Sequence, residues 1–134
     1  MKGPYDFTAL TRPLAHPGEH LREDFLPAFG LTPGALAKAM GLKDRTRVER
    51  LVRGAQPVTP DTALRLARVF GTTAEFWMTL QAAHDLSKAA IAARGRLEGI
   101  SRLEPKAAHA DRPAVREEPA QAEAMREARS FLRG

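Results

Sequence analysis

LTPGALAKAMGLKDRTRVERLVRG, the stretch at residues 31–54, contains two short helix patterns separated by a glycine. Thr32 followed by Pro33 predicts the start of the first helix, because a threonine hydroxyl caps free amides and proline fits a first turn. Gly41 predicts its end, since glycine adopts the left-handed backbone conformation without strain. The buried side of this helix is expected to consist of Leu36, Ala37 and Met40.

The second helix pattern covers about 45–53, with Asp44 as the expected N-cap and Gly54 at the end. Its inward positions are Val48, Leu51 and Val52, and its outward positions are Arg45, Arg47, Arg50 and Arg53. Five Lys/Arg against two Asp/Glu give residues 43–53 a net charge of +3, and the whole chain carries +5. Two helices joined across a glycine, the second with outward arginines, indicate a helix-turn-helix that reads DNA.

The DNA-binding residues follow from the width of the major groove, about 12 Å, which admits one α-helix. We expect the first turn of the second helix to read base edges, Arg50 to contact a base or a phosphate, and the flanking cations to contact phosphates. The amides beside Thr32 are expected to bind a further phosphate. The predicted set is Thr32, Lys43, Arg45, Thr46, Arg47, Arg50 and Arg53. The competing interpretation is that the arginines form only a solvated surface.

Helical patterns continue on both sides of this motif. An earlier helix is expected from Pro17, with Leu21, Phe25, Leu26 and Phe29 as its apolar side, and Pro27 should kink or end it. Thr59-Pro60 predicts a helix to about Phe70, with Ala63, Leu64, Leu66, Ala67 and Phe70 inward. A last helix should run from Thr73 to about Arg94, with inward positions Phe76, Trp77, Leu80, Ala83, Leu86, Ala90 and Ile91. No stretch alternates with period two, so the predicted fold class is all-α.

Three regions are predicted along the 134 residues: an N-terminal arm at 1–15, the helix-turn-helix domain at 16–94, and a linker with one short C-terminal helix at 95–134. The arm carries Tyr5, Phe7, Leu10 and Leu14 without a periodic partner; either it is a loose tail or it folds onto a protein partner. The chain has no cysteine, no signal-peptide pattern and no apolar run long enough to span a bilayer, so we expect a cytoplasmic protein.

Three longer stretches resemble the HigA-type antitoxins of the Xre-like helix-turn-helix superfamily. They are HPGEHLREDFLPAFGLTPGALAKAMGL, RTRVERLVRG and VTPDTALRLARVFGTTAEFWMTLQAAHDL, within about 16–87. The resemblance implies a five-helix, lambda-repressor-like domain, a homodimer that represses its own operon, and neutralisation of a partner toxin, typically a RelE-like ribonuclease that cleaves messenger RNA. It also maps the family's DNA-reading positions onto Arg45, Thr46, Arg47 and Arg50.

The expected dimer interface comprises Phe76, Trp77 and Leu80, because adjacent aromatics on a helix point in different directions and buried tryptophan is enriched at interfaces. Ordinary core packing of Phe76 and Trp77 is the alternative. His16 and His20 lack a third metal ligand, and the acidic residues lack a catalytic arrangement, so no metal, no cofactor and no enzyme activity are expected. Two rival functions stay open: a transcriptional regulator without a toxin, and a protein–protein adaptor that does not bind DNA.

Overall fold

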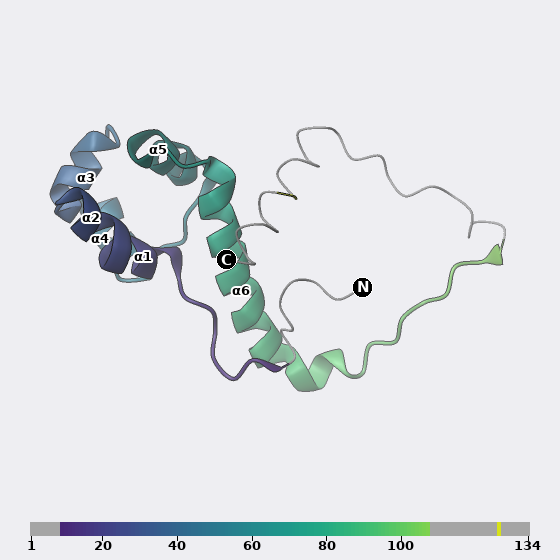
Figure 1. The fold of residues 1–134 in the computed structure, drawn as a ribbon. Helices are drawn as coiled ribbons and strands as arrows, with labels where there is room; N and C mark the ends of the chain where they lie inside the picture. The colour runs from purple at the N-terminus through teal and green to yellow at the C-terminus, as the bar shows by residue number, and fades with distance from the viewer. Residues whose placement is uncertain (1–8, 108–125, 127–134) are drawn as a thin grey trace.

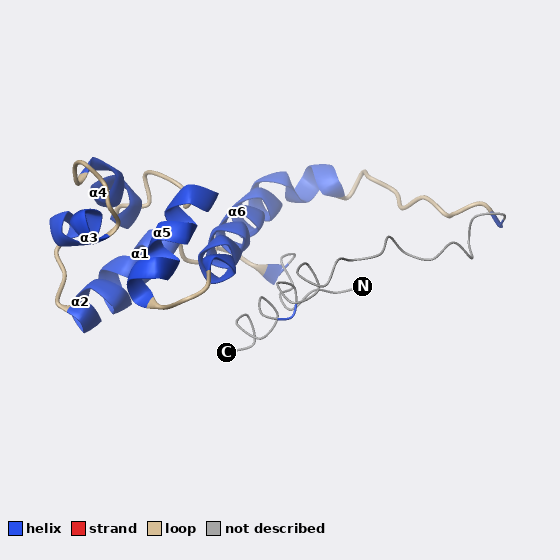
Figure 2. Ribbon diagram, turned by 90° about the horizontal axis from the view of Figure 1, so that it is seen from above, coloured by secondary structure: helices blue, strands red, loops and turns tan. Residues whose placement is uncertain are grey.

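The computed structural model describes residues 9–107 and residue 126. Its helices are α1 Pro17–His20, the π-helix η2 Leu21–Phe25, α2 Leu26–Phe29, α3 Pro33–Ala39, α4 Thr46–Val52, α5 Pro60–Phe70 and α6 Ala74–Leu97. Because α1, η2 and α2 form one continuous segment, the described chain has the five predicted helical segments and no strand. The helices α1 to α5 form one lobe, and α6 projects from it (Figures 1 and 2). Apart from residue 126, the C-terminal helix predicted within 119–132 lies outside the described residues.

The first helical segment passes through Pro27 without ending. Pro27 has no amide to donate to the carbonyl four residues back, and its ring crowds that carbonyl. The turn before it widens into η2, where the Leu26 amide donates to the carbonyl of Leu21, five residues back. The segment then continues to Phe29 and ends at Gly30. Pro27 therefore changes the hydrogen-bond register of the helix, and the helix ends only at Gly30.

The predicted threonine caps are confirmed. The hydroxyls of Thr32, Thr59 and Thr73 each accept from the amide three residues on, at 3.1, 3.4 and 3.1 Å. The cap of α4 differs from the prediction, because Arg45 occupies the N-cap position without a side-chain bond. Asp44 instead accepts the Thr46 amide at 2.9 Å from one residue earlier, so the carboxylate still orders the start of α4.

The core lies between the helices of the lobe. It comprises Leu21, Leu26, Leu36, Ala37, Met40, Val48, Leu51, Val52, Val58, Ala63, Leu66, Trp77 and Leu80. All six inward positions predicted for the two short helices are therefore confirmed. Three other inward predictions are wrong: Phe29, Leu64 and Leu86 are 54, 63 and 56% exposed. Successive residues of a helix are about 100° apart, so Leu64 and Thr62 lie on opposite sides of the buried Ala63. Thr62 is the one turned into the core, and Leu64 therefore faces solvent.

The long helix α6 also holds part of the predicted arm. We call residues 10–16 the strap; it runs from the lobe along α6 (Figure 1). The Leu14 amide donates to Ser87 Oγ at 2.8 Å, and the Leu14 carbonyl accepts from His84 Nδ1 at 2.7 Å. Arg94 donates to the carbonyl of Leu10. The strap is thus a docked segment, whereas Tyr5 and Phe7 lie outside the described residues.

The last helix extends three residues beyond the predicted end near Arg94, to Leu97. Gly95 was expected to begin the linker, but one glycine late in a long helix costs only about 1 kcal/mol relative to alanine. Residues 98–107 then leave the helix without regular structure longer than one turn. Within the described parts of the chain, no helix has the length and apolarity that a bilayer span requires.

Candidate nucleic-acid interface

The helices α3 and α4 form the predicted helix-turn-helix. Leu36 on α3 and Val48 on α4 are fully buried, and Leu51 is 1% exposed, so the two helices share one apolar contact. Gly41 between them has φ of +76°, which makes the turn possible without strain. This packing uses the inner side of α4 and leaves its outer side facing solvent.

Most of the predicted DNA-binding residues lie on that free surface. Arg45, Thr46, Arg50, Arg53 and Lys43 are all exposed. Arg45 pairs with Glu49 at 2.8 Å, but both side chains are well exposed, so this pair stabilises the fold little and can open when a phosphate approaches. The exposed side of α4 therefore offers solvent-accessible guanidinium groups at both ends of the helix.

Thr32 lies at the start of α3. Its hydroxyl oxygen already accepts the Ala35 amide at 3.1 Å, while the residue itself is exposed. The hydroxyl hydrogen is still able to donate outward. The predicted phosphate contact at Thr32 would use this hydrogen, together with amides of the first turn of α3.

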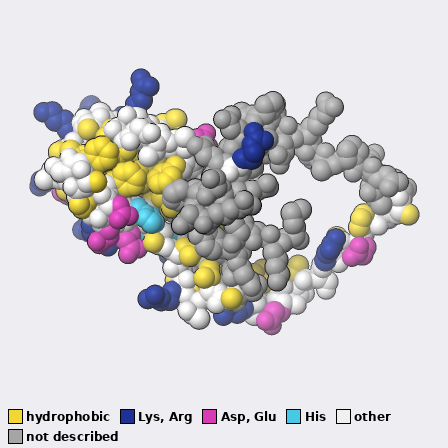
Figure 3. All heavy atoms as spheres, in the orientation of Figure 1, with side chains coloured by type: hydrophobic (Ala, Val, Ile, Leu, Met, Phe, Trp, Pro, Cys, Tyr) yellow, Lys and Arg dark blue, Asp and Glu magenta, His cyan; other side chains and the backbone are white. Residues whose placement is uncertain are grey.

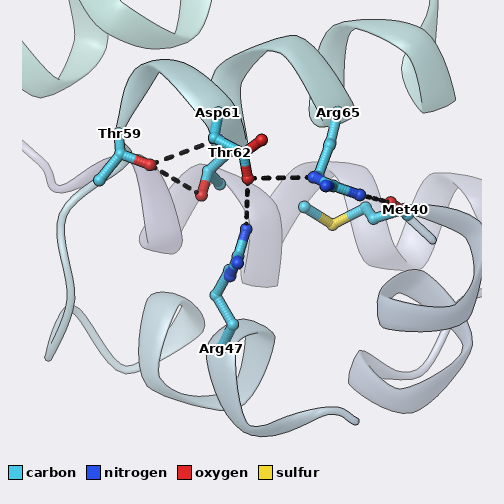
Figure 4. A network of polar contacts seen from close by, with 6 residues as sticks. All are labelled: Met40, Arg47, Thr59, Asp61, Thr62 and Arg65. Carbon is cyan, nitrogen blue, oxygen red and sulfur yellow. Dashed lines mark hydrogen bonds and ion pairs between the residues drawn. The ribbon is translucent and has the colours of Figure 1, made fainter. Parts of the chain in front are cut away.

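Arg47 differs from the other arginines because its guanidinium is engaged. Its Nη1 donates to Asp61 Oδ2 on α5 at 2.7 Å. The same carboxylate oxygen accepts from Arg65 Nε at 3.0 Å, and Arg65 Nη1 donates to the carbonyl of Met40 at 2.8 Å (Figure 4). These contacts connect α4, α5 and the end of α3. The hydrogen bonds from Arg47 and then Arg65 hold the pKa of Asp61 below its ordinary value, so the carboxylate stays charged at neutral pH.

Sequence reasoning missed Asp61 and Arg65. Their spacing of four residues at the start of α5 was a readable sign of a helical ion pair. Nothing in the sequence, however, places Arg47 beside them, because that contact joins residues 14 apart in separate helices. At Asp44 the two hydrogen bonds from Thr46, first from its amide and then from its hydroxyl, likewise lower the pKa of the carboxyl. The charged carboxylates of Asp44 and Asp61 reduce the net positive charge of this surface.

The turn between α3 and α4 contains a hollow of about 300 Å³, lined by Gly41, Leu42, Lys43, Asp44 and Arg47. It brings two cations and one carboxylate together just before and within the first turn of α4. On the face shown in Figure 3, Lys and Arg side chains lie toward the edges of the lobe, and hydrophobic side chains gather nearer its middle.

The residues predicted for a dimer interface lie in or against the core of the single chain. Trp77 is 0% and Leu80 is 7% exposed, so neither side chain leaves much surface for a second copy. Trp77 Nε1 donates to Thr72 Oγ1 at 2.8 Å, and its ring lies 4.9 Å from that of Phe25. Phe76 is partly buried and is the most exposed of the three. A dimer interface at these three residues stays a prediction.

The family model described as "Helix-turn-helix" matches residues 21–77, which includes all of α3 and α4. A curated relative, virulence-associated protein I of Dichelobacter nodosus, is 47% identical over 77 residues, covering 58% of this chain and 70% of the relative. The relatedness therefore centres on the lobe that carries the candidate interface.

Two solved structures are also similar over this region. The antitoxin HigA of Pseudomonas aeruginosa, solved with the higBA promoter, is 38% identical with a TM-score of 0.64, covering 68% of this chain and 99% of that chain. The antitoxin GraA in complex with its operator is 36% identical with a TM-score of 0.65, covering 78% of this chain and 98% of that one. Both similar chains are antitoxins held on DNA.

Proposed function

The chain belongs to the HigA-type antitoxins of the Xre-like helix-turn-helix superfamily, and we propose that it binds operator DNA as an antitoxin. The observation that carries this proposal is the exposed outer side of α4, with its arginines turned away from a buried packing contact. A rigid helix with outward guanidiniums fits a major groove, where arginine can bond guanine O6 and N7 together. The similar chains HigA and GraA, solved with promoter and operator DNA, support DNA binding by this chain.

We further propose that two copies bind an inverted repeat in the promoter of their own operon. In that arrangement the two α4 helices enter successive major grooves, about 34 Å apart. The partner silenced by the antitoxin is proposed to be a RelE-like ribonuclease that cleaves messenger RNA. Toxin binding would then both neutralise the toxin and modulate repression.

To test the DNA-binding part of the proposal, the operator is first located by footprinting in the DNA upstream of the gene. Its affinity for the chain is then measured by fluorescence anisotropy at physiological salt. Arg50→Ala should weaken binding to the footprinted operator by about 1–3 kcal/mol if Arg50 reads a base. Arg96→Ala in the last turn of α6 removes the same charge from the part of α6 that projects from the lobe, and serves as the matched control. Equal operator affinity of Arg50→Ala and the Arg96→Ala control would count against the assignment of α4.

The antitoxin part is tested separately by co-expression with the product of the neighbouring gene. A small basic protein that co-purifies with the chain, and whose growth inhibition the chain relieves, would support the proposal. A chain that binds its operator and has no such partner would instead be a regulator without a toxin. Relatives named as HTH-type transcriptional regulators, such as one of Escherichia coli that is 38% identical, favour this second candidate.

A further inference from the structure

We propose that Asp61 is a positioning residue that sets DNA specificity through Arg47. The inference rests on the proposed DNA-binding function and deepens it, because it assigns a role to a carboxylate outside the reading helix. Asp61 lies in the first turn of α5, and Arg47 lies one residue into α4. In this arrangement Asp61 fixes the direction of the arginine, and the arginine contacts the DNA.

The geometry connects α4 and α5, and through Arg65 the end of α3, at one carboxylate oxygen. Asp61 Oδ2 accepts from Arg47 Nη1 at 2.7 Å and from Arg65 Nε at 3.0 Å. Arg65 is itself fixed at its other end by the carbonyl of Met40, at 2.8 Å. Figure 4 shows Arg47 rising from α4 toward this pair. The carboxylate is therefore held from two sides before any DNA arrives.

An engaged arginine can still read DNA. A guanidinium carries five N–H donors, and Asp61 takes one of them. The Arg47 side chain is 37% exposed and lines the hollow at the turn, so part of it is accessible to a ligand. Because Asp61 already holds the side chain in one direction, Arg47 loses less conformational entropy on binding DNA than an untethered arginine does. The other exposed arginines of α4 have no such tether to another helix in the described structure.

The charge of Asp61 makes the proposal distinguishable from a purely structural role. A carboxylate near a polyanion opposes binding to every DNA sequence, through long-range repulsion. A carboxylate that orients a base-reading arginine favours only the correct sequence. Loss of the charge should therefore strengthen nonspecific binding and weaken specific binding. If Asp61 contributed only to the fold, its loss would change the specific and the nonspecific affinity in the same direction. An ion pair this exposed also contributes little to stability.

The experiment measures dissociation constants for the footprinted operator and for an unrelated duplex of equal length, at one salt concentration. Asp61→Asn should lower the ratio of specific to nonspecific affinity on the order of tenfold, the scale of one bidentate base contact. Asp61→Glu should restore much of the ratio. The matched control is Glu75→Gln, which removes a carboxylate from the first turn of α6. Thermal melting of each variant checks that the fold is retained.

A double-mutant cycle then tests whether Asp61 acts through Arg47. In an Arg47→Ala background, Asp61→Asn should leave the ratio unchanged within about twofold. An equal loss in both backgrounds, or an unchanged ratio in Asp61→Asn alone, would overturn the inference. A wild-type chain that does not distinguish the operator from the unrelated duplex would instead overturn the proposed function, before any variant is compared.

Discussion

At the scale of single residues, Gly18 determines how closely α1 approaches α4. A Cβ added at Gly18 would lie 1.8 Å from the carbonyl oxygen of Leu51 and 2.8 Å from its carbonyl carbon. Backbone atoms cannot move aside as a flexible side chain does, so α1 itself would have to shift. The sequence offered only a weak sign of this contact, namely a glycine in a helical turn where it is otherwise unfavourable.

We therefore predict that Gly18→Ala lowers the free energy of unfolding by about 1–3 kcal/mol, the usual cost of overpacking. Gly34→Ala is the matched control in α3, because its Cβ would meet nothing closer than Arg45 Cδ at 3.7 Å. That control should be neutral or stabilising by up to about 1 kcal/mol. Urea unfolding measures both. If the two variants unfold at the same midpoint, the close contact between α1 and α4 is not present in solution.

At the scale of elements, His16 links the strap to the first helix. Its Nδ1 accepts the Gly18 amide at 2.9 Å, and its ring meets that of His84 edge-on, with centroids 5.1 Å apart. Burial, and then the charge of His84, lower the pKa of His16 below the ordinary value of 6.5, with Lys88 acting in the same direction. Asp85 and the Gln56 backbone act in the opposite direction. The neutral ring is the form that caps α1, because protonation at Nδ1 removes the acceptor.

This arrangement predicts a pH dependence of stability. Between the lowered pKa of the folded chain and about 6.5, the unfolded chain binds more protons, so stability rises with pH in that window. The contribution is complete above about pH 6.5 and is lost as the pH falls toward the folded-state pKa. His16→Asn keeps a capping acceptor without the titration. Its melting temperature should fall less than that of the wild type between pH 7.5 and 5.5, and an equal fall would assign the effect to other groups.

The elements also show which parts of the fold could be predicted. The limits of α3, α4 and α5 came within one residue of expectation, apart from the earlier end of α3, because threonine caps, prolines and glycines act locally. The contact between Arg47 and Asp61 and the docking of Leu14 on Ser87 could not be predicted, since each depends on where separate helices come to lie. The exposed residues of the candidate DNA-binding surface could therefore be predicted from the sequence, but the contacts between helices that hold Arg47 could not.

At the scale of the whole molecule, two neighbouring aromatic residues near the start of α6 differ in burial. Trp77 is fully buried and lies among Phe25, Phe70 and Phe76, with ring centroids 4.9, 6.2 and 5.0 Å away. Truncating it should leave a cavity in the core of one chain. Phe76 is partly exposed, so a second copy has access to it.

We predict that Trp77→Ala lowers the free energy of unfolding by about 3–5 kcal/mol, as expected for a large aromatic removed from a core. Phe76→Ala should lower it less, because part of that ring already faces solvent. Sedimentation over a range of protein concentrations, paired with thermal melting, separates the two effects. In the proposed dimer, Phe76→Ala shifts the equilibrium toward monomer while the chain stays folded, and Trp77→Ala loses dimer only along with folded protein. A Trp77→Ala chain that melts like the wild type yet sediments as a monomer would place the tryptophan at the interface and contradict its burial within one chain.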